Sequence, residues 1–290
     1  MNILLFLNKD LEANIAFHLL QPALQGHSVG IYFSETVGHQ SRKPTDLVRL
    51  EFYEKSFVFD HLASAGLHQG PRDCFEFFGD RFVACPFIKC EDVNSAAFIT
   101  EVRPFDPDLF ISIRFGQIFR NEVLDIPKHG VLNLHSGILP DYRGILGTLH
   151  ALKDGRPKIG CTLHTIPNRG IDTGDVIEIA TLDVVHNRSL FWHIVQLYPR
   201  GVQLIAKALK EMESGRRPPS RPQNPSAGSY YSIPTEEDFV ALRSQGMEVL
   251  SAADYLDIIG QFIVADPSEE LRALVEQSFS NHNGAATHSS

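Results

Sequence analysis

The chain has 290 residues, of which 43% are hydrophobic and 21% are charged. This composition is that of a globular protein and is too apolar for a disordered one, and the length predicts one large domain with a smaller appendage. The chain has 26 Lys and Arg against 35 Asp and Glu, a net charge of -9, and no basic cluster, so nucleic-acid binding is not expected.

The amino-terminal stretch MNILLFLNKDLEANIAF has too short an apolar run for a signal peptide and lacks a basic start. No run of eighteen apolar residues occurs, so we expect a cytoplasmic protein without membrane association. Its four cysteines, which form no CxxC pair, are expected to be reduced thiols, and no metal site is predicted: Cys74, Cys85, Cys90 and Cys161.

The first half of the chain alternates between strand and helix patterns. A buried strand (2–7), a helix (11–24) and a second strand (27–33) form a βαβ opening. Amphipathic helices are predicted at 46–65 and 91–105, the latter ending near Pro104.

Apolar strands follow at 107–113 and 130–135, and β-rich segments at 159–166 and 174–184 precede a long amphipathic helix over 188–214. This order predicts an α/β fold: a Rossmann-like, mostly parallel twisted sheet with helices on both faces.

The long helix ends at Gly215, so we predict a catalytic domain over residues 1–215. Residues 216–229 are rich in proline and predict an extended linker. Residues 230–278 predict a small helical region whose first helix begins at the N-cap candidate Thr235, and 279–290 predict a disordered tail.

Two polar residues interrupt the apolar strand at 130–135. Asn133 and His135 are two positions apart and therefore share a face, near the carboxyl end where open α/β sheets bind ligands. A buried, unpaired amide or imidazole costs roughly 1 to 3 kcal/mol, so each needs a partner. One interpretation is structural, with both side chains bonding the backbone of the following turn.

The other interpretation brings in the loop NRGIDTGDVI. Asp172 and Asp175 lie there between Gly170 and Gly174, and a carboxylate from this loop can reach the imidazole. An amide donor, an imidazole and a carboxylate suit acyl transfer, with donors for an oxyanion and a carboxylate that orients or deprotonates. Ser136 lacks a GxSxG turn, so the nucleophile should come from the substrate.

The strings GVLNLHSGILPDYRG and IGCTLHTIPNRGIDTGDVI resemble the formyltransferases that use 10-formyltetrahydrofolate, which act on glycinamide ribonucleotide, methionyl-tRNA or nucleotide-linked amino sugars. The resemblance spans roughly residues 1 to 215. It rests on an Asn-x-His strand, a Leu-Pro loop, an Arg-Gly step, a Gly-x-Thr-x-His strand and an Asp-x-Gly loop, in that order.

The resemblance implies catalytic roles for Asn133, His135 and Asp172, with 10-formyltetrahydrofolate as cosubstrate and no metal. It implies amine attack on the formyl carbon through a tetrahedral intermediate, in which Asp172 assists proton removal. His164 matches the family's strand, but we expect it to be structural. The cosubstrate is expected at Arg114, Phe115, Gly116, Ile118, Gly170, Ile171 and Asp175, and the acceptor at Ser136, Tyr142 and Arg143.

The sequence defines the acceptor amine less closely than it defines the cosubstrate. The tail beyond residue 215 does not resemble the basic β-barrel of the tRNA-specific relatives, and no Gly-rich phosphate cradle is seen near the amino terminus. We expect a small-molecule amine, either a nucleotide-linked amino sugar, with Tyr230 and Tyr231 as candidate base-stacking residues, or an amino acid or hydroxylamine. Methionyl-tRNA formyltransferase, formyltetrahydrofolate hydrolase and a non-catalytic scaffold are the alternatives, and a homodimer is one expectation for the oligomeric state.

Overall fold

The computed structural model describes residues 1–35, 43–62, 87–263 and 266–284. The end of the helix predicted for 46–65 lies outside these residues, as do Cys74 and Cys85. Among the described helices, none is long and apolar enough to cross a bilayer.

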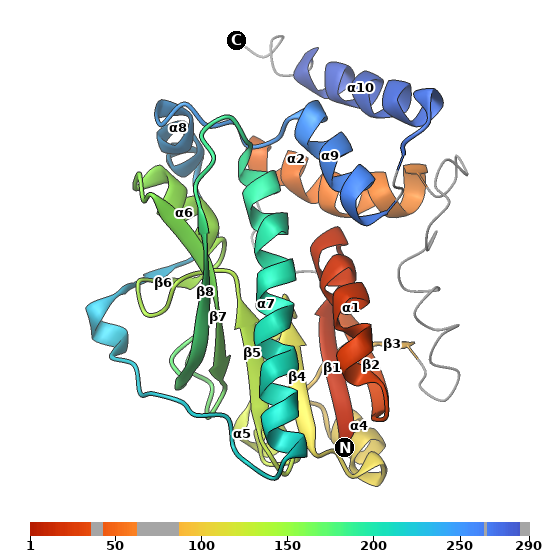
Figure 1. The fold of residues 1–290 in the computed structure, drawn as a ribbon, viewed down its shortest axis with the longest axis vertical. Coiled ribbons are helices and arrows are strands. Elements are labelled where there is room, and N and C mark those ends of the chain that lie inside the picture. Colours follow the sequence, from red (N-terminus) through yellow and green to blue (C-terminus); the bar gives the residue numbers. More distant parts are fainter. Residues whose placement is uncertain (36–42, 63–86, 264–265, 285–290) are drawn as a thin grey trace.

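A seven-stranded sheet forms the centre, in the order β3-β2-β1-β4-β5-β7-β8 (Figure 1). The first five strands of this order run parallel, while β7 and β8 are antiparallel to their neighbours, so the prediction of a mostly parallel sheet is confirmed. The bounds are β1 Asn2–Asn8, β2 Ser28–Ser34, β3 Phe87–Lys89, β4 Leu109–Ile113, β5 Val131–His135, β7 Lys158–Thr165 and β8 Val176–Asp183.

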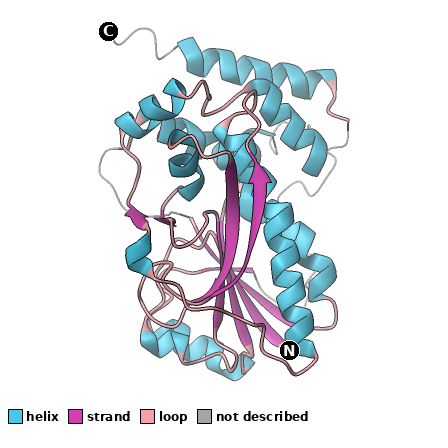
Figure 2. Ribbon diagram, turned by 60° about the vertical axis from the view of Figure 1, so that its left-hand side comes forward, coloured by secondary structure: helices cyan, strands magenta, loops and turns pink. Residues whose placement is uncertain are grey.

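Both faces of the sheet are buried, because alternate side chains of β1 enter different clusters. Ile3 and Leu5 belong to the larger hydrophobic cluster, and Leu4 and Phe6 belong to the smaller one. Helices α1 (Leu11–Leu24) and α7 (Leu190–Glu213) cover the first face, and α4 (Ala96–Val102) and α5 (Asn121–Leu124) cover the second. In Figure 2 the strands run between these two helical layers. The predicted α/β class with helices on both faces is therefore confirmed.

Helix boundaries follow local capping signals. Ser189 caps α7 and Ser95 caps α4, each by accepting a hydrogen bond from a main-chain N–H in the first turn. The helix predicted for 91–105 is shorter than expected because Ser95 starts it late. The helix predicted for 46–65 is divided into α2 (Thr45–Glu54) and a π-helical turn (Phe57–Leu62).

The remaining helices are α6 (Gly147–Lys153), α8 (Glu236–Ser244), α9 (Ala252–Phe262) and α10 (Glu269–Gly284). Helices α9 and α10 pack on α2 through an aromatic group of Tyr53, Tyr255 and Phe279. The prediction that the chain is disordered from residue 279 onwards is wrong as far as Gly284, because Phe279 is buried in this group and holds the helix in place.

The Pro-rich segment is attached to the catalytic part along its length. Arg221 forms a β-bridge with Val176, and a 3-10 turn (Pro225–Ala227) leads into β9 (Ser229–Tyr231). Strand β9 pairs in parallel with β6 (Tyr142–Gly144), which follows β5 and the turn after it. The segment therefore carries Tyr230 and Tyr231 to the edge of the predicted site.

Candidate active site

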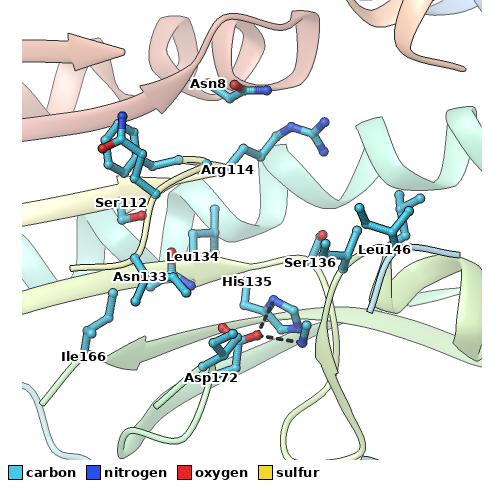
Figure 3. Close-up of a pocket in the computed structure, with 18 of the residues that line it drawn as sticks. Asn8, Ser112, Arg114, Asn133, Leu134, His135, Ser136, Leu146, Ile166 and Asp172 are labelled. Carbon is cyan, nitrogen blue, oxygen red and sulfur yellow. Dashed lines mark hydrogen bonds and ion pairs between the residues drawn. The ribbon is translucent and has the colours of Figure 1, made fainter. Parts of the chain in front are cut away.

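A cavity of about 360 Å³ opens at the carboxyl ends of β1, β4 and β5, the edge at which open α/β sheets bind ligands. Figure 3 shows Asn133, His135 and Asp172 near its middle, with Ile166 beyond Asn133 at one end and Leu146 beyond Ser136 at the other. The three residues predicted as catalytic therefore line the same cavity.

His135 is the last residue of β5, and each of its ring nitrogens has a polar partner. Nε2 lies 2.6 Å from the carbonyl oxygen of Tyr142, which can only accept, so this nitrogen carries a proton and donates it. Nδ1 lies 3.5 Å from Oδ2 of Asp172. Gly137 permits this geometry, because a Cβ there would lie 2.6 Å from Nε2. Consequently the ring can gain or lose a proton only at Nδ1.

Asp172 lies in the loop between β7 and β8 and is 9% exposed. Oδ2 accepts a hydrogen bond of 2.8 Å from the main-chain N–H of Gly144, and Oδ1 lies 3.4 Å from Nε2 of His164. Burial raises the pKa of Asp172, but the neighbouring His135 and His164 imidazoles and the hydrogen bond from the Gly144 N–H outweigh burial and hold this pKa well below its ordinary value. The carboxylate therefore stays ionised.

Asn133 has an imidazole partner that the sequence interpretation undervalued. Its Nδ2 lies 3.0 Å from Nε2 of His164, whose Nδ1 lies 2.8 Å from the carbonyl of Thr165. Nδ1 must donate to that carbonyl, so Nε2 of a neutral ring accepts from the Asn133 amide. His164 is 1% exposed and contacts both Asn133 and Asp172, which makes it a positioning residue.

Three residues that line the cavity have left-handed backbone conformations that are unfavourable for residues with a Cβ. The φ angles are 59° at Arg114, 53° at Leu146 and 53° at Asp172. Such conformations cost of order 1 to 3 kcal/mol and occur where the surrounding structure fixes a functional geometry. Their presence at one cavity supports its assignment as the functional site.

The side chain of Arg114, predicted to bind the cosubstrate, is held by the protein itself. Its guanidinium contacts Asp10 at 2.7 Å, Glu12 at 3.4 Å and Glu54 at 3.3 Å, and all three carboxylates are buried. Glu54 lies on α2 and Asp10 caps α1, so the cluster ties these helices to the loop after β4. Arg114 therefore lines the cavity, but its guanidinium is paired with these three carboxylates.

The other predicted cosubstrate residues divide into two groups. Phe115, Gly116, Ile118, Gly170 and Ile171 line the cavity. The N–H of Gly116 donates to Ser34 at 2.8 Å and the carbonyl of Ile118 accepts from Asn94 at 2.9 Å, whereas the Gly116 carbonyl and the Ile118 N–H have no hydrogen-bond partner among the described residues.

Asp175 is exposed and does not line the cavity, because its main chain is bonded to Thr165 in the loop base. The structure therefore does not bring this residue to the site, contrary to the sequence prediction.

Only one of the three predicted acceptor residues has its side chain at the cavity. Ser136 lines the cavity, whereas the side chains of Tyr142 and Arg143 do not. The Tyr142 hydroxyl is bonded to Asp154 and Arg156, and the Arg143 guanidinium donates to the carbonyl of Pro225. Both side chains point away because β6 pairs with β9. Tyr142 contributes its carbonyl, the partner of His135.

Several cavity residues were missed from the sequence. Helix α2 contributes Leu47, Leu50, Glu51 and Glu54, for which helical spacing gave no functional signal. Gln223, in the predicted linker, donates to the main-chain carbonyls of Asp172 and Gly174 at 2.9 and 2.6 Å, a contact that no local pattern reveals. Within the described residues no cluster of His, Cys, Asp and Glu suited to a metal ion is found, and Cys90 and Cys161 are buried free thiols.

The fold and the site define an open α/β protein of the Rossmann-like class, with a polar group suited to acyl chemistry at the carboxyl edge of its sheet. The sequence pattern of the family described as formyl transferase matches residues 57–201, half of the chain. The chain belongs to the formyl transferase family.

Comparison with individual proteins agrees with this family. The methionyl-tRNA formyltransferase of Chlamydia abortus is 30% identical over 155 residues, which cover 53% of this chain and 48% of that protein. The chain thus spans about half the length of the curated relatives it matches.

Two solved structures share the fold at low sequence identity. Glycinamide ribonucleotide transformylase 1 from Symbiobacterium toebii superposes with a TM-score of 0.54 at 14% identity, covering 77% of this chain and 93% of that chain. The N-formyltransferase of Helicobacter canadensis, in complex with folinic acid and dTDP-3-aminofucose, gives 0.51 at 17% identity, covering 80% and 71%.

Proposed function

We propose that this chain transfers the formyl group of 10-formyltetrahydrofolate to the amine of a small molecule. The observation that carries the proposal is the meeting of Asn133, His135 and Asp172 in one cavity, with His135 and Asp172 separated by 3.5 Å. When bound, the cosubstrate supplies an electrophilic formyl carbon and, after transfer, a nitrogen leaving group.

The lining of the cavity fits such a cosubstrate. Phe115, Ile118 and Ile171 provide apolar surface for flat rings, and the Gly116 carbonyl and Ile118 N–H provide the polar groups a heterocycle edge requires. Ile118 and Ile171 are both exposed at the cavity, and a bound ligand would cover these apolar side chains. The structural relative from Helicobacter canadensis is described as a complex with folinic acid, a formylated folate.

His135 and Asp172 would act as a charged pair. Since Nε2 of His135 is committed to the Tyr142 carbonyl, a proton from the amine can be taken up only at Nδ1, beside Asp172. The low pKa of Asp172 makes it a weak base, so we assign it to orienting the ring and stabilising its cationic form rather than to removing the proton itself. The 3.5 Å separation leaves room for Nδ1–H to be shared with a substrate oxygen.

Asn133 would supply the second donor. Its Nδ2 has two hydrogens, one of which is directed to His164. The other can donate to the oxygen that becomes negative during attack, as in an oxyanion hole. His164 thereby fixes which end of the amide is available.

Methionyl-tRNA is a second candidate acceptor, because the curated relatives with about 30% identity are named methionyl-tRNA formyltransferases. Affinity for tRNA rests on contacts between cationic side chains and phosphates, which a net charge of -9 opposes. We therefore rank a small-molecule amine first.

The test is a transfer assay with 10-formyltetrahydrofolate, run with small primary amines, with methionyl-tRNA, or with no acceptor. Release of tetrahydrofolate that requires a small amine, and that is lost in Asp172→Asn, supports the proposal. Release without any amine identifies a hydrolase, and formylation of methionyl-tRNA alone identifies the second candidate. Either result overturns the proposal, as does inactivity with every acceptor.

A further inference from the structure

Tyr230 has an exposed aromatic ring at the cavity. Within the described part of the chain seven large apolar side chains are exposed, and Ile118, Ile171 and Tyr230 among them line this cavity. Ile118 and Ile171 belong to the two loops that we assign to the cosubstrate. Tyr230 belongs to β9 and is 50% exposed, and its side chain has no hydrogen bond or ring contact among the described residues.

The backbone beneath Tyr230 is fixed. Strand β9 pairs with β6 so that Tyr230 is opposite Arg143, and the N–H of Ile145 donates to the carbonyl of Tyr231 at 2.9 Å. Gly144 makes room for the ring, because a Cβ there would lie 3.0 Å from Cε2 of Tyr230 and 2.0 Å from the Tyr231 carbonyl oxygen. The ring therefore lies close to Gly144 and is half exposed at the cavity.

The neighbouring tyrosine has a different role. The ring of Tyr231 stacks on His150, with centroids 3.9 Å apart, and lies 5.9 Å from the ring of Tyr142. Lys153 approaches its face as well. Tyr231 thus packs β9 onto the protein, whereas Tyr230 presents its ring to the cavity, and the pair offers a matched comparison on one strand.

Tyr230 lies close to the reacting groups. The N–H of Gly144, the glycine that the Tyr230 ring approaches, is the donor that holds Oδ2 of Asp172 at 2.8 Å. Leu146 lies at the end of the cavity opposite Ile166 (Figure 3), and Ile233, two residues beyond β9, also lines the cavity. The residues assigned to the cosubstrate belong to other segments, namely the loop after β4 and the loop between β7 and β8, so we assign the side of the cavity formed by β9 to the acceptor.

We propose that Tyr230 is the platform on which the acceptor stacks, and that the acceptor amine is carried directly on a ring, as in an amino sugar. An aromatic side chain binds the apolar face of such a ring and so determines specificity. In a nucleotide-linked amino sugar a ribose and two phosphates separate the nucleobase from the amino sugar, so the ring nearest the reacting amine is the sugar itself. This inference rests on the proposed function and names its acceptor class.

The test compares ring-borne amines, namely dTDP-3-aminofucose and glucosamine, with the linear amines L-ornithine and N5-hydroxyornithine, each with 10-formyltetrahydrofolate. We expect a ring-borne amine to be the better acceptor. For that amine, Tyr230→Ala should raise KM about tenfold or more and lower kcat at saturation about threefold at most. Tyr230→Phe, which keeps the ring, should restore KM, and Tyr231→Phe should match the unsubstituted protein.

Three results would overturn the inference while leaving the proposed function standing. These are preference for a linear amine, an equal loss in Tyr230→Ala for ring-borne and linear amines, and a loss confined to kcat. Inactivity of the unsubstituted protein with all four amines would remove the proposed function, and this inference with it. Circular dichroism melting of each variant distinguishes lost binding from lost folding.

Discussion

The side chain of Gln223 holds the backbone of Asp172: its Nε2 donates to the carbonyl oxygens of Asp172 and Gly174, at 2.9 and 2.6 Å. Asp172 has a φ of 53°, so its conformation depends on such external contacts. Gln223 comes from the Pro-rich segment, which thereby takes part in building the active site.

Gln223→Leu should therefore lower kcat about tenfold or more while the fold persists, because small displacements of a reacting group have large effects on rate. Steady-state kinetics with the preferred acceptor measures this. Gln196→Leu is the matched control, since Gln196 is bonded only to the exposed Gln261 among the described side chains. Equal kcat values for the two variants would show that the loop holds its conformation without Gln223.

His164 offers a second prediction through its contact with Asn133, which joins Nε2 to Nδ2 at 3.0 Å. His164→Leu removes the acceptor that orients the amide and should lower kcat about a hundredfold, close to the loss of one oxyanion donor, with little change in either KM. His164→Gln can accept the same amide hydrogen through its side-chain oxygen and should recover part of the rate.

The control for His164 is the buried His193, which bonds main-chain groups near Ser189 away from the cavity. His193→Gln should alter the melting temperature more than kcat. If His164→Leu and His164→Gln both turn over at the rate of the unsubstituted protein, the orienting role is wrong.

Asp172 predicts a dependence of stability on pH. Its pKa is lower in the folded state than the value of about 3.9 of an unfolded chain, so its ionised form stabilises the fold above about pH 4, and this contribution is lost as the pH falls through the folded-state pKa. Asp172→Asn cannot show this loss. In urea unfolding the variant should be less stable by about 1 to 3 kcal/mol at pH 7, with a smaller difference at pH 3. A difference that is constant with pH would contradict the assignment.

The sequence predicted the parts of the site that depend on regular alternation. Asn133 and His135 share a face of β5 because strand periodicity is two, and Asp172 reaches them because β7 lies next to β5 and the loop that carries Asp172 joins β7 to β8. Periodicity carries no information on side-chain direction in short irregular pieces. For this reason Tyr142 and Arg143 were assigned to the acceptor, although the pairing of β6 with β9 turns them away.

Contacts between residues far apart in the sequence are equally invisible to local sequence patterns. The family resemblance predicts Arg114 at the cosubstrate because this residue begins the segment after the strand that precedes Asn-x-His. Its partners Asp10, Glu12 and Glu54 lie far away in the sequence, in segments whose local pattern gives no sign of an ion pair. The disordered tail was predicted from composition, and the burial of Phe279 against Tyr53 overrides composition there. In each case the deciding contact joins residues more than fifty positions apart.

The cluster around Arg114 yields the last prediction. Burial raises the pKa of Glu12 well above its ordinary value; Arg114 lowers it in part, and the nearby Glu54 and Asp10 raise it further. The folded protein then binds this proton more tightly than the unfolded chain, whose glutamate pKa is about 4.3. By linkage, the contribution of Glu12 to stability is present below about pH 4 and falls by about 1.4 kcal/mol per pH unit until the folded-state pKa is reached.

Glu12→Gln keeps the size of the side chain and removes the titration. We expect its melting temperature to exceed that of the unsubstituted protein by at least about 2 °C at pH 8, and the advantage to vanish near pH 4.5. Glu122→Gln, at an exposed position of α5, should change neither value. An advantage of equal size at both pH values would mean that Glu12 is ionised in the folded protein, because only a proton held by the folded state makes the difference depend on pH.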